Sequence, residues 1–571
     1  MSDYIILGIQ YGGHDTSAAL MINGMLVAAC EQERIDLQKH SRAFPIEAIN
    51  ECLKIAKKTM SDVSIISVGG DFIDMIKNVY LKPALKDEKR IDFLIKDIER
   101  IKTFYQMENK IRKETKFKGP INFFRHHKCH LASTYYPSGF DEALLVSYDG
   151  VGEIESGMIG RSSNGEIEIL HDSVHYPHSL GLLYSAITFF LGWKHHCDEG
   201  IIMGLAPFGD HSKKVPGDKR TYLEVFEEIV FSTGPLNYEI DLKWIEYHNK
   251  RDTWVSNKFK SIFGEKREYD EEILDHHKNI AAALQKRLED IVLGQLEYCR
   301  KKYDLEKLCI SGGVGLNCSL NGKILSSGIF KEIFVQPASG DSGISVGATY
   351  LANKENSKDN FQLNKNHNFY IGSIASDAEI EDCIIKSGQL YEKPKNFYSK
   401  VAEYLSEGKI VGWFQGGAEF GPRALGNRSI LSRPFPADQR DHINKRVKFR
   451  EEFRPFAPAV LDEFTNEFFD IKQESPHMLI ACKVISSKKD IIPAVVHIDD
   501  TCRVQTVKRN NNEKFYNLLT EFNRITDCPV LLNTSFNVKG QPIVNTPSQA
   551  IDSFISTKID VLAIGSYILV K

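Results

Sequence analysis

Residues 4–30 read YIILGIQYGGHDTSAALMINGMLVAAC, and this stretch decides the fold class. A β-branched run ends in the polar glycine turn GGHD at 12–15, and two further apolar runs are joined by Asn-Gly. Because Asn-Gly supplies the positive φ values of a tight hairpin, the pattern predicts a strand, a turn and a hairpin. Residues 142–170 repeat this order, with the turn DGVG at 149–152 and a second Asn-Gly. The repetition predicts an internally duplicated α/β domain.

Helical periodicity separates the strand-like runs. Apolar residues recur at helical spacing behind Pro45, and again between residues 280 and 296. Strands that alternate with helices are typical of a three-layer α/β fold. The polar segment 354–367 predicts a linker, and a second strand-rich unit begins at residues 409–414 and runs to residue 571.

Composition limits the class of protein. The chain has 571 residues, 42% hydrophobic and 26% charged, which predicts a protein of roughly two to four domains with large cores. Its net charge of −4 favours neither nucleic acid nor an anionic membrane as a partner. The most apolar stretch, 179–193, is shorter than the roughly 20 residues that span a bilayer, and predicts a buried helix. Eleven cysteines without a CxxC pair indicate reduced thiols in a cytoplasmic protein.

One group of side chains has the residue types of a metal site. His126 and His130 stand four apart, so on a helix both imidazoles project from one face. Asp149 and Asp341 each follow an apolar strand inside a glycine-rich turn. Two imidazoles and two carboxylates suit iron, manganese or zinc, without a choice among them. A surface or helix-capping role for the histidines is the alternative, and the loop cluster His195-His196-Cys197 is assigned a structural role.

A second pattern could hold phosphates. The glycines of SGGVG at 311–315 follow a strand and lead into a helix, so backbone N–H groups could approach phosphate oxygens. Asn317 is placed to reach such a ligand, and a plain turn is the alternative. The motif matches neither the P-loop nor the dinucleotide fingerprint.

The second unit carries arginines beside apolar residues in EFGPRALGNRS at 419–429 and KFREEFRPF at 448–456. A buried arginine needs an anionic partner, which a phosphate or carbamoyl phosphate could supply through forked hydrogen bonds. Ion pairs with neighbouring glutamates are the alternative. Arg503 and the donor-rich turn NTSFN at 533–537 add to what is predicted to be a site for a small, oxygen-rich anion.

These motifs together resemble one family, the carbamoyltransferases that modify nodulation factors, cephalosporins and aminoglycosides. The resemblance covers nearly the whole chain. It is carried by GGHD at 12–15, EQER at 31–34, the HxxxH pair, SLGLLY at 179–184, MGLA at 203–206, SGGVGLNC at 311–318, the two arginine stretches and LNTSFN at 532–537.

The resemblance implies two α/β domains with a linker between them. Residues 1–355 would form an actin-like (ASKHA) domain that transfers the carbamoyl group, and residues 368–571 a YrdC-like domain that makes carbamoyl adenylate from carbamoyl phosphate and ATP. Residues 356–367 would be the linker. The acceptor would be a hydroxyl of a small molecule or saccharide, its identity open, and a homodimer is compatible with this interpretation.

The resemblance also implies roles for individual residues. His14 would be the general base, with the ordering of the glycine turn as the alternative role. Fe²⁺, or Mn²⁺ or Zn²⁺, would be bound by His126, His130, Asp149 and Asp341. The nucleotide would contact Asp149, Ser179, Gly313 and Asn317. Carbamoyl phosphate would be bound by Arg423, Arg454, Arg503, Asn533 and Ser535, with Lys39 reaching in from the first domain.

Three alternative functions compete with this interpretation. A tRNA threonylcarbamoyl transferase is disfavoured by the acidic charge balance. A non-catalytic actin-like nucleotide-binding scaffold would need neither the arginines nor the HxxxH pair. A sugar kinase would leave the second domain unexplained.

Overall fold

The structure is a computed structural model that describes residues 3–171, 174–357, 368–451 and 453–571. Two compact units divide it, one of residues 1–14, 21–25 and 59–365, the other of residues 15–20, 26–58 and 366–571. Most of the predicted linker lies outside the described residues, and α15 still includes residues 356 and 357. The domain limits at 355 and 368 stay a prediction. No helix in the described ranges is both long and apolar enough to cross a membrane.

The predicted strand–turn–hairpin order is confirmed in both places. The first copy consists of β1 (Ile5–Gln10), β2 (Ser17–Ile22) and β3 (Met25–Glu31), and the second of β6 (Glu142–Tyr148), β7 (Gly157–Ser163) and β8 (Glu166–His171). Both Asn-Gly pairs have the positive φ values expected of them, 50° and 82° at Asn23-Gly24 and 51° and 82° at Asn164-Gly165.

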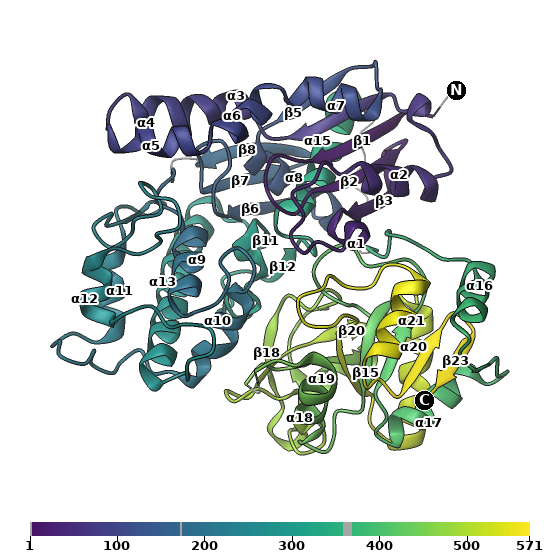
Figure 1. Cartoon of the computed structure of the whole chain (residues 1–571). Coiled ribbons are helices and arrows are strands. Elements are labelled where there is room, and N and C mark those ends of the chain that lie inside the picture. The colour runs from purple at the N-terminus through teal and green to yellow at the C-terminus, as the bar shows by residue number, and fades with distance from the viewer. Residues whose placement is uncertain (1–2, 172–173, 358–367, 452) are drawn as a thin grey trace. The chain divides into compact units, whose positions relative to one another are not determined.

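Two five-stranded sheets have the same topology (Figure 1). Their orders are β3-β2-β1-β4-β5 and β8-β7-β6-β11-β12. The parallel pairs are β1 with β4 and β4 with β5 in the first sheet, and β6 with β11 and β11 with β12 in the second. The added strands are β4 (Ile65–Gly69), β5 (Ile121–Phe124), β11 (Lys307–Ser311) and β12 (Glu332–Val335). The α/β class and the internal duplication are therefore confirmed.

The main helices of the first unit are α8 (His126–Ser138), α9 (Leu180–Phe190), α10 (Glu199–Leu205), α13 (Asp275–Tyr303), α14 (Cys318–Ser326) and α15 (Ile344–Ser357). The predicted buried helix is α9, and the apolar period of residues 280–296 belongs to α13. Shorter helices are α3 (Phe72–Met75), α4 (Lys82–Ala84), α5 (Lys89–Lys96), α6 (Ile98–Tyr105), α7 (Met107–Thr115), α11 (Tyr222–Ile229) and α12 (Asn257–Phe263).

The close approach of α8 and α15 depends on a glycine. A Cβ placed on Gly347 of α15 would lie 1.9 Å from the backbone carbonyl oxygen of Cys129 in α8. Only a residue without a side chain fits at this helix crossing. The crossing matters for the site, because α8 carries two of the predicted ligands and the turn before α15 carries a third.

The second unit is built on an eight-stranded mixed sheet of order β13-β23-β22-β14-β15-β21-β16-β20. Its strands are β13 (Tyr391–Glu392), β14 (Val411–Phe414), β15 (Arg428–Ser432), β16 (Ala457–Leu461), β20 (Gln505–Val507), β21 (Val530–Ser535), β22 (Val561–Ile564) and β23 (Tyr567–Val570). A small sheet of β17 (Phe469–Asp470), β18 (Ala481–Val484) and β19 (Thr501–Arg503) accompanies it.

The helices of this unit include α2 (Ile46–Ile55), which begins directly after Pro45 as its periodicity predicts. The others are α1 (Glu33–Asp36), α16 (Asp377–Ser387), α17 (Phe397–Ser406), α18 (Gln439–Ile443), α19 (Thr465–Phe468), α20 (Glu513–Thr526) and α21 (Pro547–Ser556).

Candidate functional sites

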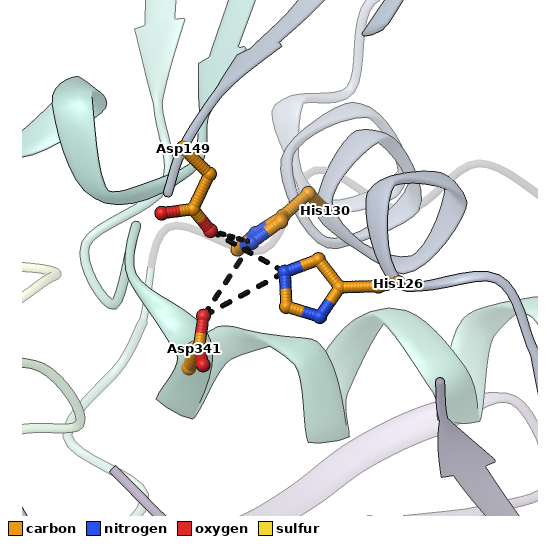
Figure 2. A group of neighbouring side chains, drawn as sticks. All are labelled: His126, His130, Asp149 and Asp341. Atoms are coloured by element: carbon orange, nitrogen blue, oxygen red, sulfur yellow. Dashed lines mark hydrogen bonds and ion pairs between the residues drawn. The ribbon is translucent and has the colours of Figure 1, made fainter. Parts of the chain in front are cut away.

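The four predicted metal ligands converge in the first unit (Figure 2). One ligand atom of each of His126, His130, Asp149 and Asp341 lies within 4.8 Å of the others. Oδ2 of Asp149 lies 2.8 Å from Nε2 of His130 and 3.3 Å from Nε2 of His126. Oδ1 of Asp341 lies 3.7 and 3.9 Å from the same two nitrogens.

Chain topology explains this convergence. His126 and His130 occupy the first two turns of α8, and Asp149 follows the last residue of β6. Asp341 begins the short 3-10 turn Asp341–Gly343 that leads into α15. Three segments far apart in the sequence thus place their polar side chains at the ends of buried elements, where open α/β sheets build sites.

The electrostatics of the cluster fit a cation. Burial by itself would raise the pKa of Asp149, but hydrogen bonds from His126 and His130 hold it well below its ordinary value. Burial would lower the pKa of His126, yet its hydrogen bond to Asp149 and the charge of Asp341 raise it to about 9. Burial raises the pKa of Asp341 and outweighs the opposing charges of His14 and His126. A divalent ion would compensate both carboxylates, so the donor set fits one.

Glu153 holds the backbone next to the first histidine of the cluster. Its Oε1 accepts hydrogen bonds from the backbone N–H of His126, at 2.8 Å, and from that of Asp71, at 2.6 Å. The first of these caps the start of α8 and fixes the position of the first histidine. Sequence reasoning missed this residue, although it lies four positions after Asp149 in the same turn.

The glycine loop at 311–315 is built around the same aspartate. The backbone N–H of Gly313 donates to Oδ1 of Asp149 at 3.2 Å, and a Cβ on Gly313 would lie 2.9 Å from that oxygen. Gly312 has a φ of 82°, and a Cβ there would lie 2.2 Å from the carbonyl oxygen of Tyr148. The glycines are therefore required by the close approach of this loop to the end of β6.

Two predicted nucleotide contacts have protein partners. The Ser179 hydroxyl donates to the carbonyl oxygen of Asp149 at 2.7 Å and is buried. The Asn317 side chain donates to Gln285 at 2.8 Å and accepts from the backbone N–H of Leu320 at 2.9 Å, which caps α14. Both side chains shape the loop in this structure.

His14 lies beside the metal cluster in the same unit. It is half-buried, and its charge acts on the carboxyl group of Asp341. A Cβ on Gly13 would lie 3.3 Å from Oδ2 of Asp341. The backbone directly before His14, the predicted base, is therefore close to Asp341, a predicted metal ligand.

The second unit contains a cluster of cations, which we call the cationic site; it comprises Lys39, Lys448, Arg450, Arg454 and Arg503. Burial, then the charges of Arg450, Arg454 and Lys39, hold the pKa of Lys448 well below its ordinary value. Burial, then the charges of Arg454 and Arg503, do the same for the pKa of Arg450. Glu451 lies 3.6 Å from Arg454. Among the described residues, Glu451 is the one carboxylate that acts on these two pKa values, so several buried or half-buried cations here indicate an anion site.

Ser535 of β21 borders the cationic site, and Asn533 lies two positions earlier on the same face of that strand. Lys448 Nζ donates to Oγ of Ser535 at 3.2 Å and to Oδ1 of Asn537 at 2.8 Å. The Asn533 amide donates to the carbonyl oxygen of Ala424 at 3.3 Å and to Gln505 at 3.0 Å. Its Oδ1 is buried and accepts no hydrogen bond from the described residues. An anion bound here would have a buried acceptor beside it.

The predicted residue Arg423 directly precedes Ala424, the residue that binds Asn533, and Lys39 belongs to the same compact unit as the arginines. The sequence placed Arg450 and Asn537 in the two stretches of the predicted anion site, but named neither of them, nor Lys448, as an individual ligand. Lys448 and Arg450 flank Phe449 at the start of the second arginine stretch. By contrast, Arg428 is fully buried and donates to the carbonyl oxygen of Gln415 at 2.6 Å, which is a structural role.

Comparisons with known proteins agree over most of the chain. The family model described as carbamoyltransferase N-terminus matches residues 5–350, and that described as carbamoyltransferase C-terminus matches residues 402–571. The nodulation protein NolNO of Sinorhizobium fredii is 36% identical over 98% of this chain and 79% of its own length. The uncharacterized protein sll1178 of Synechocystis is 34% identical over 99% of this chain and 96% of its own length.

Among solved structures, component A of the (R)-2-hydroxyglutaryl-CoA dehydratase of Acidaminococcus fermentans gives a TM-score of 0.34 at 12% identity. The match covers 62% of this chain and 100% of that chain.

Proposed function

The chain belongs to the carbamoyltransferase family, and on that premise we propose that it is an ATP-dependent O-carbamoyltransferase that works through carbamoyl adenylate. In this proposal residues 1–355 form an actin-like (ASKHA) transfer domain and residues 368–571 a YrdC-like domain that activates the carbamoyl group. The acceptor is a hydroxyl group of a small molecule or saccharide.

The observation that carries the proposal is the cationic site together with Oδ1 of Asn533. Carbamoyl phosphate has a phosphate at one end and an –NH₂ group at the other. The cations match the phosphate, and the buried amide oxygen, which accepts no bond from the described residues, matches the –NH₂ donor. A simple phosphate site would have no use for that acceptor. The proposed ligands of carbamoyl phosphate are Lys39, Arg423, Arg454, Arg503, Asn533 and Ser535. The proposal also includes Lys448 and Arg450, because both belong to the cationic site.

The proposed activation step consumes one water molecule. Water cleaves the bond between the carbamoyl group and phosphate, which releases inorganic phosphate and leaves carbamate. A carbamate oxygen then attacks the α-phosphorus of ATP and forms the carbamoyl adenylate, while pyrophosphate leaves. The role of the cations is to hold the anionic carbamate against a second anion, which would repel it in water.

The transfer step is assigned to the first unit. His14 takes the proton of the acceptor hydroxyl, the hydroxyl oxygen attacks the carbamoyl carbon, and AMP leaves. Asp149 and Gly313 border the nucleotide, and Ser179 and Asn317 keep the loop in shape around it. A divalent ion bound by His126, His130, Asp149 and Asp341 would supply positive charge near the developing negative charge.

The exchange of labelled pyrophosphate into ATP tests the proposal. We expect exchange that depends on carbamoyl phosphate in the wild type and falls by about 10–100-fold in Arg454→Ala, because hydrogen bonds to a charged group contribute about 1.5–3 kcal/mol. Arg524→Ala, which removes an exposed arginine of α20, is the matched control and should keep full exchange. Exchange that is independent of carbamoyl phosphate, or equal in Arg454→Ala, would contradict the proposal.

A further inference from the structure

The motif EQER at residues 31–34 has no role in the reaction proposed above. In the structure α1 begins within this motif, and the segment that follows the helix, residues 37–41, carries Lys39. We call these five residues the Lys39 loop. The motif, the loop and the cationic site all belong to the second unit.

Helix α1 is attached to the first arginine stretch, residues 419–429. Arg34 is buried, its Nε donates to Oε2 of Glu31 at 2.9 Å, and its Nη2 donates to the carbonyl oxygen of Gly421. Gly421 lies two positions before Arg423, one of the proposed ligands of carbamoyl phosphate. The helix that precedes the Lys39 loop is therefore bound to a segment that carries another residue of the proposed site.

The backbone of the Lys39 loop has an unusual conformation. Leu37 and His40 have φ values of 59° and 57°, in the left-handed region that non-glycine residues rarely adopt. A glycine is the usual residue where a chain leaves a helix in this conformation, but Leu37 occupies the position here. Two such residues so close to Lys39 require contacts that stabilise them.

Two carboxylates supply contacts to His40. Oε2 of Glu33 accepts a hydrogen bond from the backbone N–H of His40 at 2.7 Å. Nδ1 of the His40 ring donates to Oδ1 of Asp15, also at 2.7 Å. One bond holds the backbone directly after Lys39, and the other holds the side chain of the same residue.

The rest of the Lys39 loop is held in the same way. Asp36 accepts hydrogen bonds from the backbone N–H of Gln38 at 2.9 Å and from the hydroxyl of Ser41 at 2.5 Å. The carbonyl oxygen of Ser41 accepts from the backbone N–H of Thr16 at 3.2 Å. Hydrogen bonds therefore fix the backbone on both sides of Lys39.

Lys39 itself is exposed, and its positive charge acts on Lys448 of the cationic site. A lysine side chain loses much conformational freedom when it is ordered against a ligand. A backbone that is already fixed limits this loss, because only the side chain has to be ordered on binding. The contacts of Glu33 and His40 thus bear directly on how well Lys39 can bind an anion.

We propose that Glu33 and His40 are positioning residues, which hold the backbone of Lys39 so that its ammonium group meets the phosphate of carbamoyl phosphate. The inference rests on the proposed function and assigns a role to two residues that act through Lys39. Glu33 acts as a hydrogen-bond acceptor, so its position requires an oxygen and not a negative charge. His40 acts through the ring that donates to Asp15.

The affinity of the whole chain for inorganic phosphate tests the inference without turnover. Isothermal titration calorimetry is carried out with EDTA, so that phosphate bound to a metal ion does not contribute. Lys39→Ala should lower the affinity by about tenfold and Glu33→Ala by at least about threefold. Glu33→Gln keeps an acceptor oxygen and should bind phosphate like the wild type. Lys54→Ala, at an exposed lysine of α2, is the matched control and should also bind like the wild type.

A double-mutant cycle separates positioning from a general loss of structure. In a Lys39→Ala background, Glu33→Ala should cause no further loss of phosphate affinity, because the group that Glu33 positions is absent. In the exchange assay, the carbamoyl phosphate concentration that gives half-maximal exchange should rise in Glu33→Ala, whereas that of ATP should not change. His40→Gly adopts the left-handed backbone without strain and should also lower the phosphate affinity, which covers the case in which Glu33→Ala fails to fold.

The outcomes separate the two proposals. Absence of carbamoyl phosphate-dependent exchange in the wild type overturns the proposed function, while the phosphate titrations still test the positioning role. Normal exchange with unchanged phosphate affinity in Glu33→Ala and His40→Gly overturns the inference alone. The inference also fails if the wild type binds no phosphate, or if the losses in Lys39→Ala and Glu33→Ala are additive. A loss in Glu33→Gln as large as that in Glu33→Ala overturns it as well.

Discussion

Oδ2 of Asp149 lies 2.8 Å from Nε2 of His130, while Oδ1 of the same carboxylate accepts a hydrogen bond from the backbone N–H of Gly313 at 3.2 Å. One carboxylate therefore joins the histidine cluster to the glycine loop. The two motifs that the sequence shows separately form one site.

The cluster predicts one divalent ion per chain. After anaerobic loading with Fe²⁺, and separately with Mn²⁺ and Zn²⁺, we expect close to one bound ion in the wild type. His130→Ala removes a ligand, and its metal affinity should fall by at least about tenfold. Metal content by plasma mass spectrometry after gel filtration is the measurement. His276→Ala, at a half-buried histidine of α13, is the control, and equal metal loss in both variants would contradict a site at His130.

The crossing of α8 and α15 predicts contrasting effects of two glycine substitutions. Gly347→Ala places a Cβ 1.9 Å from the carbonyl oxygen of Cys129, so the helices must separate, and the free energy of unfolding should fall by about 1–3 kcal/mol. Gly294→Ala in α13 has no atom within 4 Å and should increase stability by up to about 1 kcal/mol. Urea denaturation measures both.

Metal affinity should also fall in Gly347→Ala, because the helix that carries the histidines moves relative to the turn that carries Asp341. An unchanged unfolding free energy in Gly347→Ala would show that the two helices are not packed as described.

The lowered pKa of Lys448 predicts a pH-dependent affinity for phosphate. Burial and the neighbouring cations hold this pKa well below the ordinary lysine value of about 10.4, so Lys448 loses its proton as pH rises through a window below that value. A bound anion favours the protonated form, so binding requires proton uptake there. The rise in Tm caused by inorganic phosphate should therefore decrease as pH increases through that window towards 10.

Without phosphate, the contribution of Lys448 to the free energy of unfolding changes with pH in the opposite direction. In this window the unfolded chain holds the proton and the folded chain does not, so the contribution of Lys448 to stability rises with pH. Lys448→Arg keeps the charge at every pH and should weaken both pH dependences. A phosphate effect on Tm that is constant from pH 7 to pH 10 in the wild type would show that Lys448 does not contact the anion.

Much of the fold could be predicted from local sequence. The two Asn-Gly hairpins, the helix behind Pro45 and the periodic helix α13 all depend on neighbours within a few residues, and all are confirmed. The HxxxH spacing also predicted that His126 and His130 share one face of a helix, because residues four apart lie on the same side of an α-helix.

Contacts between distant segments were harder to predict. Glu153 binds the backbone of His126 from another element, and the ring of His196 reaches His14 across more than 180 positions of sequence. Lys448 lies in a stretch assigned to the anion site but was not predicted as a ligand itself, because its burial depends on surroundings that the sequence does not show. These interactions depend on the tertiary fold and leave no local periodicity.

Mass spectrometry of the activated intermediate shows whether the reaction proceeds through carbamoyl adenylate. The wild-type protein, incubated with carbamoyl phosphate and ATP in the absence of an acceptor, should form a compound with the mass of carbamoyl adenylate, together with pyrophosphate and inorganic phosphate. Omission of carbamoyl phosphate should abolish it. Formation of ADP in place of the adenylate and pyrophosphate would exclude carbamoyl adenylate as the intermediate.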